Sequence, residues 1–263
     1  MNGSPRENAS GPAGRKLGAA ERAVWLFDRA APMNFAIGAD LDGPVSPRRL
    51  VDTFARAARR HPLLSARIEA DSAEKPRFVA QPDVVPDTQA ALVETLPPWE
   101  TLYETELGCR FPWRTGPLAR MKAFSTPDDR HRLMLVFHHA VSDGLGGIRL
   151  LDELTAELAG TPTPKPAALP DPIESRLPAA CRGRRHPLRL GALLLRQAAG
   201  ALFPARRLPP EQWAPPRDRR NAALCRTLSE QQTGRLAAAC RTKGVTVHAA
   251  LSAALLKGTA DLL

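Results

Sequence analysis

Apolar residues recur along this chain in two spacings. Short runs rich in β-favouring residues predict strands, and the run at 132–137 is apolar at nearly every position, which is typical of a strand covered on both faces. Apolar residues three and four positions apart predict helices, and Ser46 followed by Pro47 marks the start of one of them. The predicted strands are 34–41, 66–70, 77–81, 118–124 and 132–137, and the predicted helices are 47–60, 99–107 and 148–158. This arrangement indicates the α/β fold class.

A different pattern follows Gly160, where a Pro-rich stretch predicts a linker. Further on, Ser229 and Gln232 have capping-box spacing and predict a helix that reaches about residue 243. A last helix over 247–256 is apolar over much of its surface, so we expect it to dock on the first lobe or on another subunit, or to leave an exposed patch. The expected parts are a disordered leader at 1–17, a lobe at 18–160, a Pro/Arg-rich crossing segment at 161–218 and the beginning of a second lobe at 219–263.

Composition places the chain among globular proteins that bury a sizeable core, since 43% of the 263 residues are hydrophobic and 24% are charged. The longest apolar run, 190–203, is interrupted by Arg196 and Gln197, so we expect no membrane span. The N-terminus lacks the apolar core of a signal peptide, and we expect a cytoplasmic protein. The cysteines have neither CxxC nor metal-ligand spacing and are expected to be reduced. They are Cys109, Cys181, Cys225 and Cys240.

The net charge of +10 and the pI near 10.3 raise nucleic acid as a partner. Aromatic residues make up only 5% of the chain and do not alternate with the basic ones, as a stacking platform would require, so a nucleic-acid-binding protein ranks last among the functions considered. Basic residues are densest at 182–189 and 206–220. This region is either a solvated crossing segment or a landing site for an acidic carrier protein, the phosphates of coenzyme A or an anionic lipid.

Candidate chemistry lies at 138–144, where His138 and His139 leave the apolar strand and Asp143 and Gly144 follow. Successive side chains of a strand point to opposite faces, so one histidine can face a cleft while the other faces the packing. A metal site built from both histidines and Asp143 is disfavoured because the two rings diverge. The stretch 144–147 lacks the residues of a phosphate-binding P-loop and is expected to form a tight loop.

The segment 138–144 reads HHxxxDG, preceded by a GPLxR segment at 116–120 and, further upstream, by an RHxxLR-type segment beginning at Arg60. In order and spacing these segments resemble the superfamily of condensation domains and coenzyme A-dependent acyltransferases. Within it the chain is most similar to standalone O-acyltransferases of the wax-ester synthase, alcohol acetyltransferase and polyketide-associated types. The resemblance implies a chloramphenicol-acetyltransferase-like lobe with a mixed β-sheet flanked by helices, plus the start of an incomplete second lobe.

The resemblance also assigns roles. His139 is implied as the general base that takes the proton of an alcohol or amine as it attacks a thioester, and His138 as a structural histidine. Asp143 is implied to hold the loop by pairing with an arginine, with Arg120 as the first candidate and Arg67 as the second. Gly144 is expected to supply backbone freedom for the turn into the next helix. Acyl-coenzyme A or a phosphopantetheine thioester is implied as co-substrate, with no tightly bound cofactor.

Two further expectations concern partners. The family builds its site between two lobes and this chain carries one of them, so it is expected to be a truncated relative, a fragment or a half that needs a partner, and to be weak alone. A small-molecule acyl acceptor, an acyl carrier protein and a homodimer or complementing lobe are the partners considered. The alternative function is a catalytically silent half-domain that binds a carrier protein or partner without turnover.

Overall fold

The computed structural model describes residues 14–70, 75–178 and 221–261, together with the single positions 191, 195, 196 and 215. The chain divides into two compact units. The first runs to Leu177 and also includes 220–223, and the second comprises the remainder, with the helices α6 (Glu230–Thr242) and α7 (Val247–Ala260). Outside the described residues lie the basic stretch at 182–189, all of 206–220 except position 215, most of the apolar run at 190–203, and Cys181.

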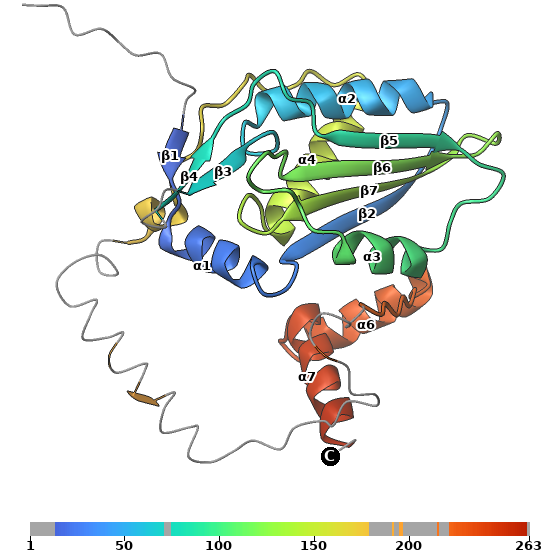
Figure 1. Ribbon diagram of the computed structural model, residues 1–263. Coiled ribbons are helices and arrows are strands. Elements are labelled where there is room, and N and C mark those ends of the chain that lie inside the picture. The colour runs from blue at the N-terminus through green and yellow to red at the C-terminus, as the bar shows by residue number, and fades with distance from the viewer. Residues whose placement is uncertain are drawn as a thin grey trace, which may run out of the picture. The chain divides into compact units, whose positions relative to one another are not determined.

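The first unit is built on a four-stranded sheet in the order β2-β7-β6-β5, shown in Figure 1. β7 pairs antiparallel with both β2 and β6, whereas β5 runs parallel to β6, so the sheet is mixed as predicted. A separate three-stranded sheet has the order β1-β4-β3. The strands are β1 (Gly14–Lys16), β2 (Asn34–Asp42), β3 (Arg67–Ala70), β4 (Pro76–Val79), β5 (Asp87–Leu92), β6 (Ala119–Ser125) and β7 (Arg130–His138).

Helices cover the larger sheet on both faces. Its two faces carry separate apolar clusters, one containing Phe54 of α2 and Leu154 of α4, the other containing Trp25 of α1 and Leu102 of α3. The helices of this unit are α1 (Ala19–Asp28), α2 (Pro47–Arg60), α3 (Trp99–Gly108), α4 (Gly144–Leu158) and the 3-10 turn η1 (Ile173–Arg176). The predicted α/β lobe with a mixed sheet flanked by helices is therefore confirmed.

Strand β7 lies in the middle of the sheet and alternates between the two clusters. Leu133, Leu135 and Phe137 belong to the cluster of α2 and α4, while Met134 and Val136 belong to the cluster of α1 and α3. All five are at most 1% exposed. Continuing this alternation places His138 on the α1 side and His139 on the α4 side, which sets the two histidines of the motif in different surroundings.

Two expected boundaries differ from the structure, and one strand was not predicted. Gly14–Lys16 of the predicted leader pairs with β4 as β1, while 1–13 lie outside the described residues. The first unit continues past residue 160 because the amide of Ala167 donates to the carbonyl of Arg60 at 3.0 Å and Glu174 accepts from the amide of Ala20 at 2.8 Å. The edge strand β5 was not predicted, because its sequence DTQAAL is mostly exposed and has no apolar alternation.

The second unit contains α6 (Glu230–Thr242) and α7 (Val247–Ala260). The predicted capping box begins α6, where the Ser229 hydroxyl accepts from the amide of Gln232 at 3.2 Å. Thr246 caps α7 by accepting from the amide of Ala249 at 3.0 Å. α7 has no buried residue within its own unit, and the three expectations for its apolar surface remain predictions. In the described parts of the chain, no helix has the length and apolarity that crossing a membrane requires.

Candidate active site

His138 ends β7 and is completely buried. Its Nδ1 accepts a hydrogen bond from the amide of Ala140 at 3.1 Å, so the ring proton lies on Nε2. Nε2 lies 3.7 Å from Oδ1 of Asp28, a carboxylate at the end of α1 that is only 1% exposed. This distance is longer than a hydrogen bond, and Nε2 has no hydrogen-bond partner among the described residues. The expected structural role of His138 fits this buried position.

Asp28 contacts three residues from different parts of the chain: His138, Met33 and Arg110. Its Oδ1 accepts from the amide of Met33 at 2.8 Å, and Arg110 lies 3.7 Å from Oδ2 while its guanidinium also donates to the Asp28 carbonyl. Burial alone would raise the pKa of Asp28, but His138, the Met33 amide and the charge of Arg110 together outweigh burial and hold the pKa below its ordinary value. The carboxylate is therefore kept ionised beside the last residue of β7.

His139 has the opposite surroundings, since its side chain is exposed. Its ring lies 4.9 Å from the ring of Phe35 and is tilted by 50°. Nδ1 lies 3.1 Å from the carbonyl oxygen of Ser142, an atom that only accepts, so Nδ1 carries the ring proton. Nε2 is then left with its lone pair, which is the tautomer that a general base needs.

Asp143 caps helix α4. Its Oδ1 accepts from the amide of Gly146 at 2.8 Å, which satisfies one of the amides that a helix start leaves without a partner. Neither of the two expected arginine partners, Arg120 and Arg67, pairs with Asp143 among the described residues. The contact that the structure gives to the Asp143 side chain is with the start of α4.

Arg120 of β6, the first candidate partner of Asp143, is hydrogen-bonded to α3 instead. Its Nε donates to Glu106 of α3 at 2.6 Å, and its Nη2 donates to the carbonyls of Glu106 and Cys109. Both charged side chains are 9% exposed, so the pair is a buried structural contact between β6 and α3. The second candidate, Arg67, pairs with Glu69 on its own strand at 2.5 Å.

The glycines within 144–147 have a structural role that differs from the expected one. Residues 144–147 form the first turn of α4 and no separate tight loop, and Gly144 does not need a left-handed conformation. Gly147 is the residue that the packing requires, because a Cβ there would lie 2.7 Å from Cγ1 of Ile37 and 3.2 Å from the ring of Phe35. Its missing side chain lets the start of α4 approach β2 closely.

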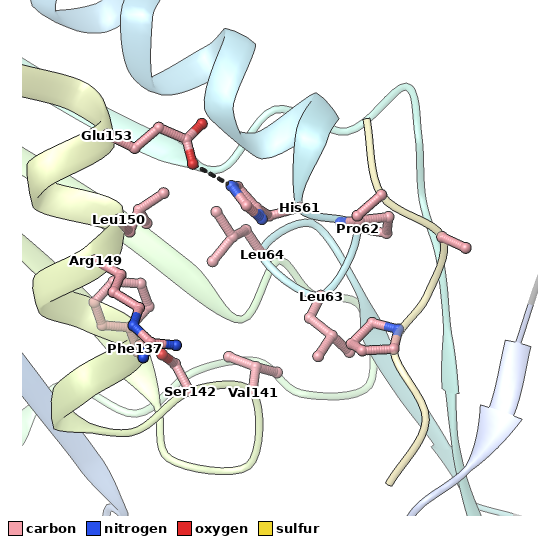
Figure 2. A pocket seen from close by; sticks show the side chains of 14 residues that line it. His61, Pro62, Leu63, Leu64, Phe137, Val141, Ser142, Arg149, Leu150 and Glu153 are labelled. Atoms are coloured by element: carbon pink, nitrogen blue, oxygen red, sulfur yellow. Dashed lines mark hydrogen bonds and ion pairs between the residues drawn. The ribbon is translucent and has the colours of Figure 1, made fainter. Parts of the chain in front are cut away.

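A cavity of about 330 Å³ lies beside the motif loop (Figure 2). Ser142 and Arg149 line it on the motif side, and His61 with Glu153 on the other. Between them the walls are apolar: Pro62, Leu63, Leu64, Phe137, Val141, Leu150, Ala167, Ala168 and Pro170. His139 does not line this cavity, although the Ser142 carbonyl that orients His139 belongs to a residue that does.

Glu153 of α4 organises the far side of the cavity. Its Oε1 accepts from Nε of Arg60 at 2.6 Å, and its Oε2 lies 2.7 Å from Nε2 of His61. Arg60 also reaches Glu157 at 2.6 Å. The RHxxLR-type segment therefore joins the end of α2 to α4, and His61 faces the cavity with Nδ1 on the side away from its carboxylate.

Sequence reasoning placed His138, His139 and Asp143 at a strand end and in the turn that follows. In the structure His138 is the last residue of β7, His139 follows it, and Asp143 caps α4. Sequence reasoning missed Asp28, His61, Arg149 and Glu153. Arg149 and Glu153 carried a usable signal, because they border the apolar stripe of α4 four positions apart and so lie on one face of the helix. Asp28 carried none, since nothing in the sequence shows that the end of α1 meets the end of β7.

No protein-family model matches the chain, and no curated protein matches it at a significant level. Solved structures do share its fold. The condensation domain from the monacolin K polyketide synthase MokA superposes with a TM-score of 0.59 at 17% identity, covering 89% of this chain and 56% of that one. The first condensation domain of the calcium-dependent antibiotic synthetase, in complex with a substrate analogue, gives 0.50 at 20% identity over 61% of this chain and 43% of that one.

The starter condensation domain of the rhizomide synthetase RzmA gives a TM-score of 0.50 at 13% identity, covering 58% of this chain and 40% of that one. These likenesses show that the chain has the fold of condensation domains. This chain spans 56% of the length of the MokA domain, and 40% to 43% of the other two. The fold that the histidine motif predicted is thus found in the structure.

Proposed function

We propose that this protein transfers an acyl group from a thioester to an alcohol or amine, with His139 as general base. The observation that supports this proposal is the 3.1 Å contact between Nδ1 of His139 and the Ser142 carbonyl oxygen, because an oxygen that only accepts assigns the proton to Nδ1 and leaves the lone pair on Nε2 of an exposed side chain. The fold shared with condensation domains supports the same class of reaction. Of the two acceptors, the proposal favours the alcohol. The acyl donor is a thioester of coenzyme A or phosphopantetheine, and an acyl carrier protein is a partner.

In the proposed reaction, Nε2 of His139 takes the proton of the acceptor hydroxyl or amine as its oxygen or nitrogen attacks the thioester carbonyl. The new C–O or C–N bond forms, the C–S bond breaks, and the proton passes from the imidazolium to the departing thiolate. A thioester is already electrophilic, so positioning and proton removal are the main requirements. A well-placed base contributes on the order of 10² to 10⁴ in rate.

Release of free thiol tests this proposal. Acyl-coenzyme A donors of several chain lengths are mixed with an alcohol or an amine, and thiol release is compared for the wild type, His139→Ala and His248→Ala, the last being an exposed histidine on α7. We expect acceptor-dependent release that falls by about 10² or more in His139→Ala and is unchanged in His248→Ala. Equal acceptor-dependent release from all three proteins would overturn the role of His139.

A second candidate function is ligand or partner binding without turnover. The observation that favours it is the separation of the cavity from His139, since the lining residues include Ser142 and not the imidazole. Absence of acceptor-dependent release with every donor, from protein whose fold is verified by circular dichroism, would favour this candidate over acyl transfer.

A further inference from the structure

The cavity between α4 and the segment after α2 has mostly apolar walls and one charged side chain, that of Arg149, without an ion-pair partner among the described residues. Glu153 is balanced by Arg60 and hydrogen-bonded to His61. Arg149 is exposed and forms no ion pair with any described residue. The electrostatic preference of this cavity is therefore for an anion on its Arg149 side.

The remaining walls select for an apolar group. Leu63 and Leu150 lie between the two polar ends, and Phe137 is completely buried beneath them. Arg149 and Glu153 are four residues apart on α4, so their backbones are separated by about 6 Å along the helix axis. A volume of about 330 Å³ is at the small end of ligand-binding cavities and, at about 30 Å³ per water-sized group, holds roughly ten non-hydrogen atoms.

We propose that this cavity is a binding site for a medium-chain monocarboxylate. The carboxylate lies against the guanidinium of Arg149 near Ser142, and the alkyl chain extends over Phe137 between Leu63 and Leu150 toward the His61–Glu153 pair. This site is distinct from the reacting atom of His139. It therefore holds whether or not the protein catalyses acyl transfer.

Titration calorimetry with octanoate, octan-1-ol and acetate tests the site, because octanoate has both the charge and the size that the cavity fits. We expect octanoate to bind more tightly than the neutral alcohol, and acetate to give no measurable binding, since each buried methylene strengthens binding by about fourfold. Arg149→Gln is expected to weaken octanoate about tenfold and to leave octan-1-ol unchanged, because it removes a charge-assisted hydrogen bond.

Two variants make the location testable. Ala168 is an exposed residue of the cavity wall, so Ala168→Trp fills the mouth without disturbing the buried core and is expected to abolish binding of both eight-carbon ligands. Arg241→Gln, an exposed arginine of α6, is the matched control for lost charge and is expected to bind as the wild type does. Circular dichroism verifies the fold of each variant.

Three results would overturn the proposal. They are no octanoate binding by folded wild type, octanoate binding that is equal in wild type and Arg149→Gln, and full binding in Ala168→Trp, which would place the ligand elsewhere, for example on the apolar α7. No acyl donor is present in these titrations, so their failure is distinct from failure of thiol release.

Discussion

The two histidines of the motif are neighbours in sequence and opposites in surroundings. His138 is completely buried beside the ionised Asp28, whereas His139 is exposed and its Nδ1 is hydrogen-bonded to the Ser142 carbonyl. The cause is the pleat of β7, which sends one side chain to the α1 face and the next to the α4 face. The difference teaches that two neighbouring residues of one motif can have separate physical roles, one buried at the strand end and the other with its side chain at the surface.

Replacing each histidine by alanine should separate the two roles most strongly. His138→Ala removes a fully buried ring and leaves the Ala140 amide without its partner, so we expect a loss of about 2 to 3 kcal/mol in the free energy of unfolding. His139→Ala is expected to change this free energy by less than about 0.5 kcal/mol because its ring is exposed. Urea denaturation measures both, and equal losses would contradict the division of roles.

Asp28→Asn should produce a smaller effect that depends on pH. Because the folded-state pKa of Asp28 is lowered, its ionised form contributes stability above the unfolded-state pKa, and this contribution is lost as pH falls through the folded-state pKa. We expect Asp28→Asn to lose about 1 to 2 kcal/mol at pH 7.

The pH series distinguishes this contribution from a general packing defect. The difference between wild type and Asp28→Asn should be constant above about pH 5 and should shrink as the pH falls below about 4. Asp52→Asn, at an exposed position of α2, serves as control and is expected to change stability by less than about 0.5 kcal/mol. Urea denaturation at each pH provides the measurement, and a difference that does not vary with pH would count against a contribution from the ionised Asp28 carboxylate.

The smallest expected effect is at Asp143. Its side chain caps α4, so Asp143→Ala should lose about 1 kcal/mol, whereas Asp143→Asn should lose almost nothing because asparagine caps equally well. Thermal unfolding of both variants tests this. If Asp143 were paired with Arg120 instead, loss of the carboxylate charge alone would be strongly destabilising, and the two variants would behave alike.

The parts of the fold that follow from local pattern were predictable. Apolar runs located β2, β6 and β7, and Ser46 with Pro47 located the start of α2, because these signals lie within a few residues of the element they define. β5 was not predictable in this way. It is a polar edge strand whose only reason to be extended is its parallel pairing with β6.

The candidate site likewise has features that the local sequence pattern predicted and features that depend on distant contacts. Strand alternation was enough to separate His138 from His139, but the partners of charged side chains depend on contacts between distant elements. Arg120 meets Glu106 because α3 packs near β6, and no spacing in the sequence distinguishes that acid from Asp143. The close approach at Gly147 was hidden for the same reason, since the side chain of Ile37 that requires it lies on another strand.

The cap at Asp143 also sets the rotational phase of α4. Each residue of an α-helix turns the side-chain direction by about 100°. Gly146, Arg149, Leu150 and Glu153 lie together on the face of α4 that lines the cavity. A helix started one residue later would turn this face away from the cavity and would carry Glu153 away from Arg60 and His61. The hydrogen bond at the helix start and the packing of α4 thus favour the same rotational phase, and this phase decides, ten residues further on, which side chains line the cavity.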